Sequence, residues 1–112
     1  MHRSNTYRQQ ALDAALAASA TLTGTSFETG GSPSAHREFG AYFLSDAASA
    51  AGGARLEISQ DGATWVPVKT ATLAAGVPQE LATPILAKYH RAVLENAAGA
   101  ANVTVIDFAR VN

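Results

Sequence analysis

The chain has 112 residues, 47% of them hydrophobic and 15% charged, and a formal net charge of −1. A chain of this length is the size of one ordinary domain with a single hydrophobic core. Its eight cationic residues are scattered along the sequence, which argues against nucleic acid as a partner because a phosphate backbone is bound by clustered cations.

The sequence contains no cysteine, which excludes disulfides and thiolate metal sites. No continuous apolar segment follows the positive charges near the N-terminus, so a signal peptide is not expected. No segment approaches the roughly 20 apolar residues of a membrane span. We therefore expect a protein made in a cytoplasm, with no membrane partner.

Residues 1–18 differ from the remainder and allow two interpretations. Thr6 and Gln9 have the spacing of a helical capping box, and one helical face is shared by Leu12, Ala15, Leu16 and Ser19. Alternatively, the alternation from Leu16 to Leu22 indicates a strand preceded by an extended arm. The predicted organisation is an N-terminal arm over residues 1–18, extended or a short helix and docked on a partner, followed by a domain over residues 19–112.

The rest of the chain alternates short apolar segments with turn-forming clusters, which predicts an all-β fold. We expect an antiparallel β-sandwich of jelly-roll type with about eight strands. Besides a strand near Leu16, the expected strands are 21–28, 37–45, 54–59, 64–72, 80–85, 88–95 and 103–110. Pro67 predicts an edge strand or a bulge, because proline cannot donate to a ladder. Residues 29–35 and 46–53 are expected loops, and residues 96–102 are expected to close the last hairpin.

The strand expected at 37–45 is apolar on both faces. Phe39, Ala41 and Phe43 lie on one face, and Tyr42 and Leu44 lie on the other. A strand with two apolar faces is central in a sheet or covered by another subunit.

The segment "ISQDGATWVPV" predicts a β-hairpin, because Asp61-Gly62 supplies the positive φ that a tight turn requires. Leu56 and Ile58 are expected to point inward, and Trp65 to anchor the core on the returning strand. The functional alternative is that Asp61 binds a metal or that Trp65 stacks on a sugar. One local carboxylate is too few for a calcium site, so we expect a structural hairpin. The predicted hairpin and core residues are Asp61, Gly62, Trp65, Leu56, Ile58, Phe39 and Phe43.

Two resemblances rest on this part of the chain. The spacing Ser59-x-Asp61-Gly62-x-x-Trp65 resembles the hairpin of discoidin-like and galactose-binding-like β-sandwiches. The order of motifs from Ala54 to Val111 is similar to that of small β-sandwich structural proteins of tailed bacteriophages, with Leu56–Ser59, Asp61-Gly62, Trp65, Lys88–Val93 and Ala98-Gly99 as the corresponding pieces. His90 stands where those sandwiches have an apolar residue, and no galactose-binding set can be carried over.

Other chemistry is not indicated by the sequence. His2, His36 and His90 are too far apart for a local metal site, and His90 is expected to be a half-buried packing residue. Ser45, Asp46 and His36 could be written as a triad, but no nucleophile elbow surrounds them. We therefore expect no catalytic residue, no metal and no cofactor, and a protein that is not an enzyme.

The phage resemblance implies a virion structural protein on the outer capsid surface. The expected function is that of a capsid decoration or cement protein, a homo-oligomer and specifically a trimer, that binds the major capsid protein or another virion protein. The alternatives are a tail, neck or head-fibre subunit and, from another class, a carbohydrate-binding module. The possible interface residues are Tyr7, Arg8, Leu12, Leu16, Tyr42, Tyr89 and Arg91.

Overall fold

The computed structural model describes residues 6–28 and 36–111, and every regular element in those two ranges is a β-strand. The strands in chain order are β1 (Thr6–Leu16), β2 (Thr21–Thr23), β3 (Phe27–Glu28), β4 (His36–Ser45), β5 (Ser49–Ser59), β6 (Val66–Ala71), β7 (Gln79–Pro84), β8 (Tyr89–Asn96) and β9 (Ala101–Val111). The all-β prediction is confirmed.

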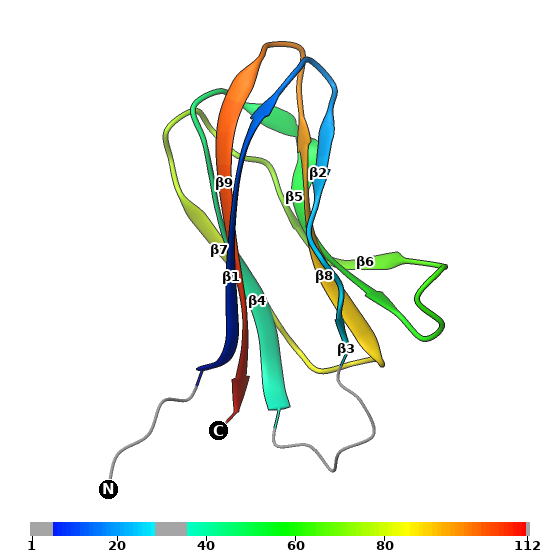
Figure 1. Cartoon of the computed structure of the whole chain (residues 1–112). Coiled ribbons are helices and arrows are strands. Elements are labelled where there is room, and N and C mark those ends of the chain that lie inside the picture. Colours follow the sequence, from blue (N-terminus) through cyan, green and yellow to red (C-terminus); the bar gives the residue numbers. More distant parts are fainter. Residues whose placement is uncertain (1–5, 29–35, 112) are drawn as a thin grey trace, which may run out of the picture.

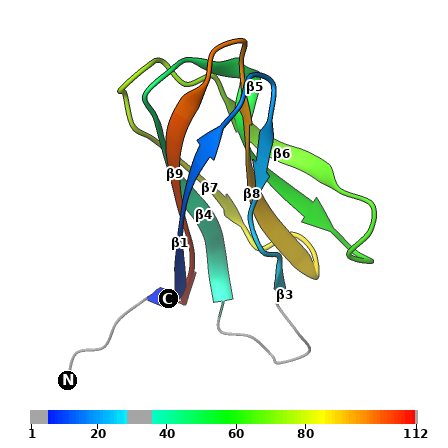
Figure 2. The same cartoon turned by 45° about the horizontal axis from the view of Figure 1, so that its top comes forward.

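The strands form two antiparallel sheets packed face to face (Figure 1). The four-stranded sheet has the order β1-β9-β4-β7, and the five-stranded sheet has the order β2-β8-β5-β6 with β3 also beside β8. Apart from the pairs β2–β3 and β5–β6, each connection passes from one sheet to the other, which Figure 2 shows from a second side. This interleaved order is that of a jelly roll, so the predicted sandwich type is also confirmed.

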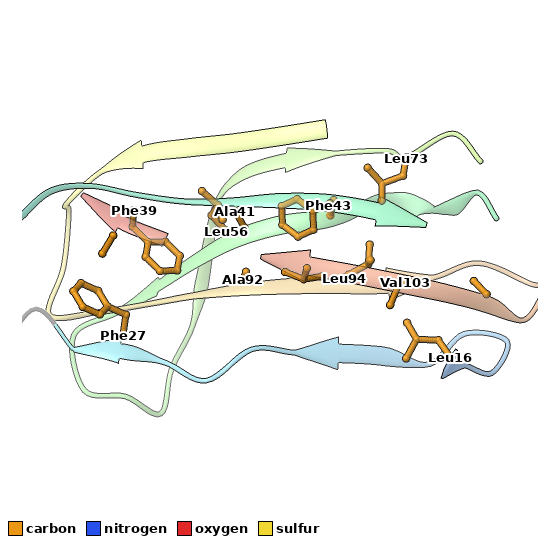
Figure 3. Packing of buried hydrophobic residues seen from close by; sticks show 14 residues of the cluster. Leu16, Phe27, Phe39, Ala41, Phe43, Leu56, Leu73, Ala92, Leu94 and Val103 are labelled. Carbon is orange, nitrogen blue, oxygen red and sulfur yellow. The ribbon is translucent and has the colours of Figure 1, made fainter. Parts of the chain in front are cut away.

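The core lies between the two sheets and is built by period-two alternation (Figure 3). Phe39, Ala41 and Phe43 of β4 have no exposed surface, and Leu56 of β5 and Leu94 of β8 meet them from the other sheet. The two phenylalanines each contribute about 1.5–3 kcal/mol by burial. β4 lies between β9 and β7, as its two apolar faces predicted.

The predicted arm is wrong for residues 6–16, which form β1 at the edge of the four-stranded sheet. The strand pairs antiparallel with β9, from Thr6 opposite Arg110 to Leu16 opposite Ala101. Leu12 and Ala14 are half-buried and Leu16 is buried, because they alternate toward the core. The sequence favoured an arm because the strand's partner is about ninety residues away and leaves no local signal. Residues 1–5 lie outside the described part of the chain.

Two expected connections also differ in the structure. Residues 49–53 belong to β5, where the register with β8 shifts between Ser49 and Ala54. A Cβ on Gly53 would lie 2.4 Å from the carbonyl oxygen of Glu95, so the bulge requires glycine there. Residues 96–102 do not close a hairpin, because β8 and β9 lie in opposite sheets. The expected loop at residues 29–35 falls outside the described residues.

The β5–β6 hairpin follows the prediction closely. Gly62 has a φ of +78°, and Figure 1 shows the hairpin projecting from one side of the sandwich. β6 is an edge strand, and its register with β5 shifts opposite Leu56 and Glu57, where Pro67 interrupts the ladder. Both consequences expected of Pro67 therefore occur together.

Candidate functional site

Asp61 organises the β5–β6 turn through one carboxylate oxygen. Asp61 Oδ1 accepts hydrogen bonds from the backbone N–H groups of Ala63 and Thr64, at 2.8 and 2.9 Å, and from the Ser59 hydroxyl at 2.9 Å. The Ser59 oxygen in turn accepts the N–H of Gly62 at 2.8 Å. These hydrogen bonds lower the pKa of Asp61 to about 2. The contacts are those of a structural turn, as the sequence predicted.

Trp65 is not the core anchor that the sequence predicted. It lies just before β6, is only partly buried, and is absent from the set of residues that form the core. The guanidinium carbon of Arg91 lies 4.2 Å from the centre of its ring, a cation–π contact on the outer side of the five-stranded sheet. Ile58 is also only partly buried, which leaves Leu56 as the fully buried residue of the predicted pair.

Glu57 connects two arginines on this outer side. Its carboxylate accepts hydrogen bonds from Arg55 Nε at 2.8 Å and from Arg91 Nε at 2.7 Å. Arg55 also donates a hydrogen bond to the carboxylate of Glu95, at 3.3 Å. Burial raises the pKa of Glu57, but the hydrogen bonds and charges of both arginines outweigh it, and the pKa is lowered. We call Arg55, Glu57, Arg91, Glu95 and Trp65 the ion-pair face. The positive charges of its two arginines balance the negative charges of its two glutamates, so the ion-pair face has no net charge.

The outer side of the four-stranded sheet is different, and we call it the open face. Ala11 and Asp13 on β1, and Tyr42 on β4, are exposed, while Ile106 on β9 is half-buried. The register places Tyr42, Ile106 and Ala11 in one row across the three strands. The row continues to the exposed Glu80 on β7, which lies opposite Tyr42. Other members of the open face are Ala15, Leu44, Asn102 and Thr104.

One end of the open face is closed by an aromatic ring. Phe108 lies over Gly40, where an added Cβ would stand 2.4 Å from the ring carbon Cζ. The guanidinium carbon of Arg110 lies 4.2 Å from the centre of the same ring, and Arg110 pairs with Glu38 at 3.0 Å. Glycine at position 40 is therefore required for packing, and Phe108 is 7% exposed although it points outward.

The other end of the open face contains a cleft of about 520 Å³. Asp13 accepts a hydrogen bond from the Thr104 hydroxyl at 2.7 Å. Asp46 accepts the backbone N–H and the side-chain amide of Asn102, at 2.8 and 3.1 Å. Leu44 also lines the cleft. The carboxylates of Asp13 and Asp46 therefore already have partners within the chain. The cleft is lined by both polar and apolar side chains.

Two titratable residues, His90 and Asp107, are fully buried between the sheets. His90 has no exposed surface, more burial than the sequence predicted, and its Nε2 accepts the backbone N–H of Leu86 at 3.2 Å. Burial lowers the pKa of His90 to about 4, so the ring is neutral beside Phe39 at ordinary pH. Asp107 occupies an inward position of β9 and is also fully buried. The sequence reasoning did not identify Asp107, although it breaks the apolar alternation of its strand.

The predicted interface residues do not gather on one surface. Tyr42 lies on the open face, whereas Arg91 is bound to Glu57 and Trp65 on the opposite side. Leu16 packs in the core, so its prediction as an interface residue is wrong. The ring of Tyr89 packs near Gly62 in the β5–β6 turn. Leu12 is half-buried on the edge strand. The side chains of Tyr7 and Arg8 are outside the described part of the structure.

Two members of the triad that could be written from Ser45, Asp46 and His36 have other partners in the structure. Ser45 accepts the N–H of Ala47, and Asp46 is held by Asn102, while the side chain of His36 is not described. No group of three or more metal-binding side chains occurs in ranges 6–28 and 36–111. The same two ranges contain no helix that is long and apolar enough to cross a membrane.

The sequence matches a known protein family. The model of the family described as "Uncharacterised protein YqxG N-terminal domain" matches residues 3–108. The chain belongs to this family. No curated protein matches this chain significantly. The match spans β1 through most of β9, so the strand at residues 6–16 is part of the family's domain.

Three solved structures are similar to this YqxG N-terminal domain. The crystal structure of the PBSX exported protein XepA has a TM-score of 0.83 at 15% identity, over 95% of this chain and 38% of that one. The crystal structure of PirA has a TM-score of 0.62 at 12% identity, over 88% and 92%. A structure of Bacillus endospore appendages, described as disulfide-linked pili, has a TM-score of 0.52 at 14% identity, over 98% and 91%.

These identities support the fold alone. The chain spans little more than a third of XepA, so the activity of that whole protein is not transferred. None of the three similar structures supports the discoidin-like resemblance, which stays a prediction from the hairpin spacing.

Proposed function

We propose that this chain is a non-enzymatic structural component of a phage or phage-derived particle. Within that class we propose a capsid decoration protein that binds the assembled outer shell. The fold is consistent with this proposal, since its similar structures include the phage-related exported protein XepA and an appendage pilus. A jelly roll alone does not specify a role, so the proposal depends on the surfaces of the domain.

The open face is the observation that carries the proposal. Its central row is neutral at Ala11, Ile106 and Tyr42 and ends at the exposed Glu80 on β7, and Tyr42 is 38% exposed. Aromatic and neutral residues with few charges are typical of the centre of a protein interface. The charged groups surround this row, with Glu80 and Asp13 beside it and Arg110 and Asp46 toward the two ends of the face. This is the arrangement of an apolar centre with a polar rim.

The proposed mechanism is physical. A subunit that binds only the assembled shell shifts the equilibrium toward assembly by the free energy of its binding. The flat open face would contact the major capsid protein. The sequence-based mechanism assigned this contact to the N-terminal arm, but residues 6–16 are a strand of the domain itself.

The test is to mix the purified protein with undecorated, expanded capsids of the phage or prophage that encodes it. The protein is expected to co-sediment with the shells, to saturate, and to raise their resistance to heat. If it neither sediments with shells nor occurs in purified virions, the decoration proposal is wrong. Imaging of labelled particles separates a shell location from the alternative of a tail, neck or head-fibre subunit.

One observation favours a second candidate, a carbohydrate-binding module. Trp65 lies outside the core, and a groove of about 280 Å³ beside the hairpin is lined by residues that include Ile58, Asp61 and Thr64. Arg91 already covers the Trp65 ring, which weakens this candidate. Glycan-array binding that is lost on Trp65→Ala, with Tyr42→Ala and Tyr89→Ala as parallel variants, would replace the decoration proposal.

A further inference from the structure

The four edges of the two sheets are not equally protected against pairing. The four-stranded sheet ends at β1 and β7, and the five-stranded sheet ends at β6 and at β2 with β3. An edge strand presents backbone N–H and C=O groups that can accept a strand from another chain. Natural proteins block this with proline, bulges, lysine or short strands.

Three of these edges carry such features. β6 contains Pro67, a register shift and the exposed Lys69. β7 has six residues, ends at Pro84 and follows Pro78. β2 and β3 have three and two residues, separated by an interruption at residues 24–26. Each of these edges is therefore a poor template for another strand.

β1 is the exception. It has eleven residues and no proline, and its register with β9 is regular after the shift between Thr6 and Arg8. From position 10 to Leu16 it has one charged residue, Asp13, which points to the open face rather than along the edge. In the sheets that the described residues form, β1 has a strand neighbour on one side only. A long edge strand with no proline and a regular register beyond Arg8 is the kind that accepts a partner strand.

We propose that β1 pairs with β1 of a second copy of this chain, antiparallel and around a two-fold axis. A second copy is the occupant because its own β1 is the one edge of the described sheets without a blocking feature. Pairing of β1 with β6, β7 or β2 of another copy would meet proline or a short strand, and would extend into an open filament. Pairing of β1 with itself uses both free edges and closes as a dimer.

The register of this pairing follows from the strand itself. Full overlap of two strands spanning Thr6–Leu16 places the two-fold axis at Ala11, the middle residue. Residues that face each other across an antiparallel pair then point to the same side, so both open faces lie on one side of a continuous sheet. Ala11 meets its own copy with a small side chain. The half-buried Leu12 lies next to the axis and would be covered in the dimer.

The dimer is independent of the proposed function, because it concerns the isolated chain. The two are also compatible, since paired copies present two open faces to one surface and gain from simultaneous binding. The sequence suggested a trimer, whereas this geometry predicts twice the mass of the chain.

The first test is the molar mass of the full chain by sedimentation velocity and light scattering between 5 and 200 μM. The 11.5 kDa chain is expected to sediment with twice that mass at the upper concentrations. Ala11→Lys places two like charges on the axis and is expected to weaken dimerisation at least tenfold. The matched control, Thr70→Lys on the exposed β6 edge, is expected to leave the dimer unchanged.

The second test uses the absence of native cysteine. Ala11→Cys is expected to form a disulfide-linked dimer within minutes of mild oxidation, because cross-strand Cβ atoms lie about 4.5–5.5 Å apart. Ala98→Cys, in an exposed loop, is expected to crosslink at least tenfold more slowly. A monomeric or trimeric mass at 200 μM would overturn the proposal. So would a folded Ala11→Lys variant that dimerises normally, or equal crosslinking of the two cysteine variants.

Discussion

The two sheets of this sandwich use their outward-facing residues in different ways. On the five-stranded sheet, Arg55, Glu57 and Arg91 bind one another, and Arg91 covers Trp65. On the four-stranded sheet, the central row of the outer side is neutral on three of its four strands and ends at Glu80 on β7, and Tyr42 remains exposed. Polar groups have partners within the chain on both faces, but on the ion-pair face they also cover the aromatic ring, whereas the open face leaves Tyr42 exposed beside neutral residues.

This difference teaches that charge and aromatic content alone do not mark the binding surface of a small domain. The ion-pair face has the tryptophan and the arginines that are enriched in binding hot spots. In this fold those groups are bound to each other, so an external partner would have to displace existing contacts. The following predictions test that distinction by comparing the stability contributed by each side.

The largest effect of pH is expected from His90, on the inner side of the five-stranded sheet. Its folded pKa of about 4 is below the ordinary value of 6.5, so between those values the unfolded chain binds a proton that the folded chain does not. Stability is therefore lost as the pH falls through this interval, by about 2 kcal/mol between pH 6.5 and pH 5. Urea unfolding at pH 7 and pH 5 measures it.

The control for this prediction is His90→Leu, which removes the titrating group and keeps an apolar side chain beside Phe39. Its stability is expected to change much less between the two pH values. Equal pH dependence in both proteins would assign the effect to other groups.

The next effect is on the ion-pair face itself. Glu57→Gln leaves two arginines without their shared carboxylate, and we expect a loss of about 1–3 kcal/mol in the free energy of unfolding. Asp13→Asn on the open face changes the same kind of group, but at an exposed position, and should cost below about 0.5 kcal/mol. Comparable losses in the two variants would remove the distinction between the faces.

Trp65→Ala is expected to cost about 1–2 kcal/mol, because it removes a cation–π contact and a partly buried ring. Phe39→Ala in the core should cost about 3–5 kcal/mol. Chemical denaturation of both variants gives the comparison. A loss at Trp65 as large as that at Phe39 would restore the core-anchor interpretation that the structure contradicts.

The smallest effect is expected in the turn. Asp61→Asn keeps an oxygen that can accept the N–H groups of Ala63 and Thr64, so the hairpin should persist with little change in unfolding midpoint. Asp61→Ala loses that acceptor and should lower the midpoint more. If Asp61→Asn abolished a binding activity while the fold survived, the turn would be a site rather than scaffold.

The fold could be predicted because its signals are local. Alternation placed Phe39 and Phe43 in the core, Asp61-Gly62 located the hairpin, and Pro67 indicated the edge. The position of Trp65 could not be predicted in the same way. Trp65 precedes β6, whose register with β5 shifts. Period-two spacing therefore does not predict which side of the sheet the Trp65 side chain faces.

The ion-pair face and β1 depended on long-range pairing. Glu57 and Arg91 are 34 residues apart in sequence and meet only because β5 pairs with β8. β1 is a strand because β9 lies beside it, and its own composition of Ala, Gln and Leu also fits a helix or an arm. The open face could be found only after the register had placed Tyr42 beside Ile106.

The most direct test of the account is co-sedimentation of three proteins with undecorated capsids. The wild type and Thr23→Glu, a substitution on the exposed outer side of β2, are expected to bind alike. Tyr42→Glu, in the middle of the open face, is expected to lower binding at least tenfold while the domain stays folded, with a small drop in unfolding midpoint because the new carboxylate lies opposite Glu80. Full binding by Tyr42→Glu, or loss of binding by Thr23→Glu alone, would contradict the assignment of the open face as the docking surface.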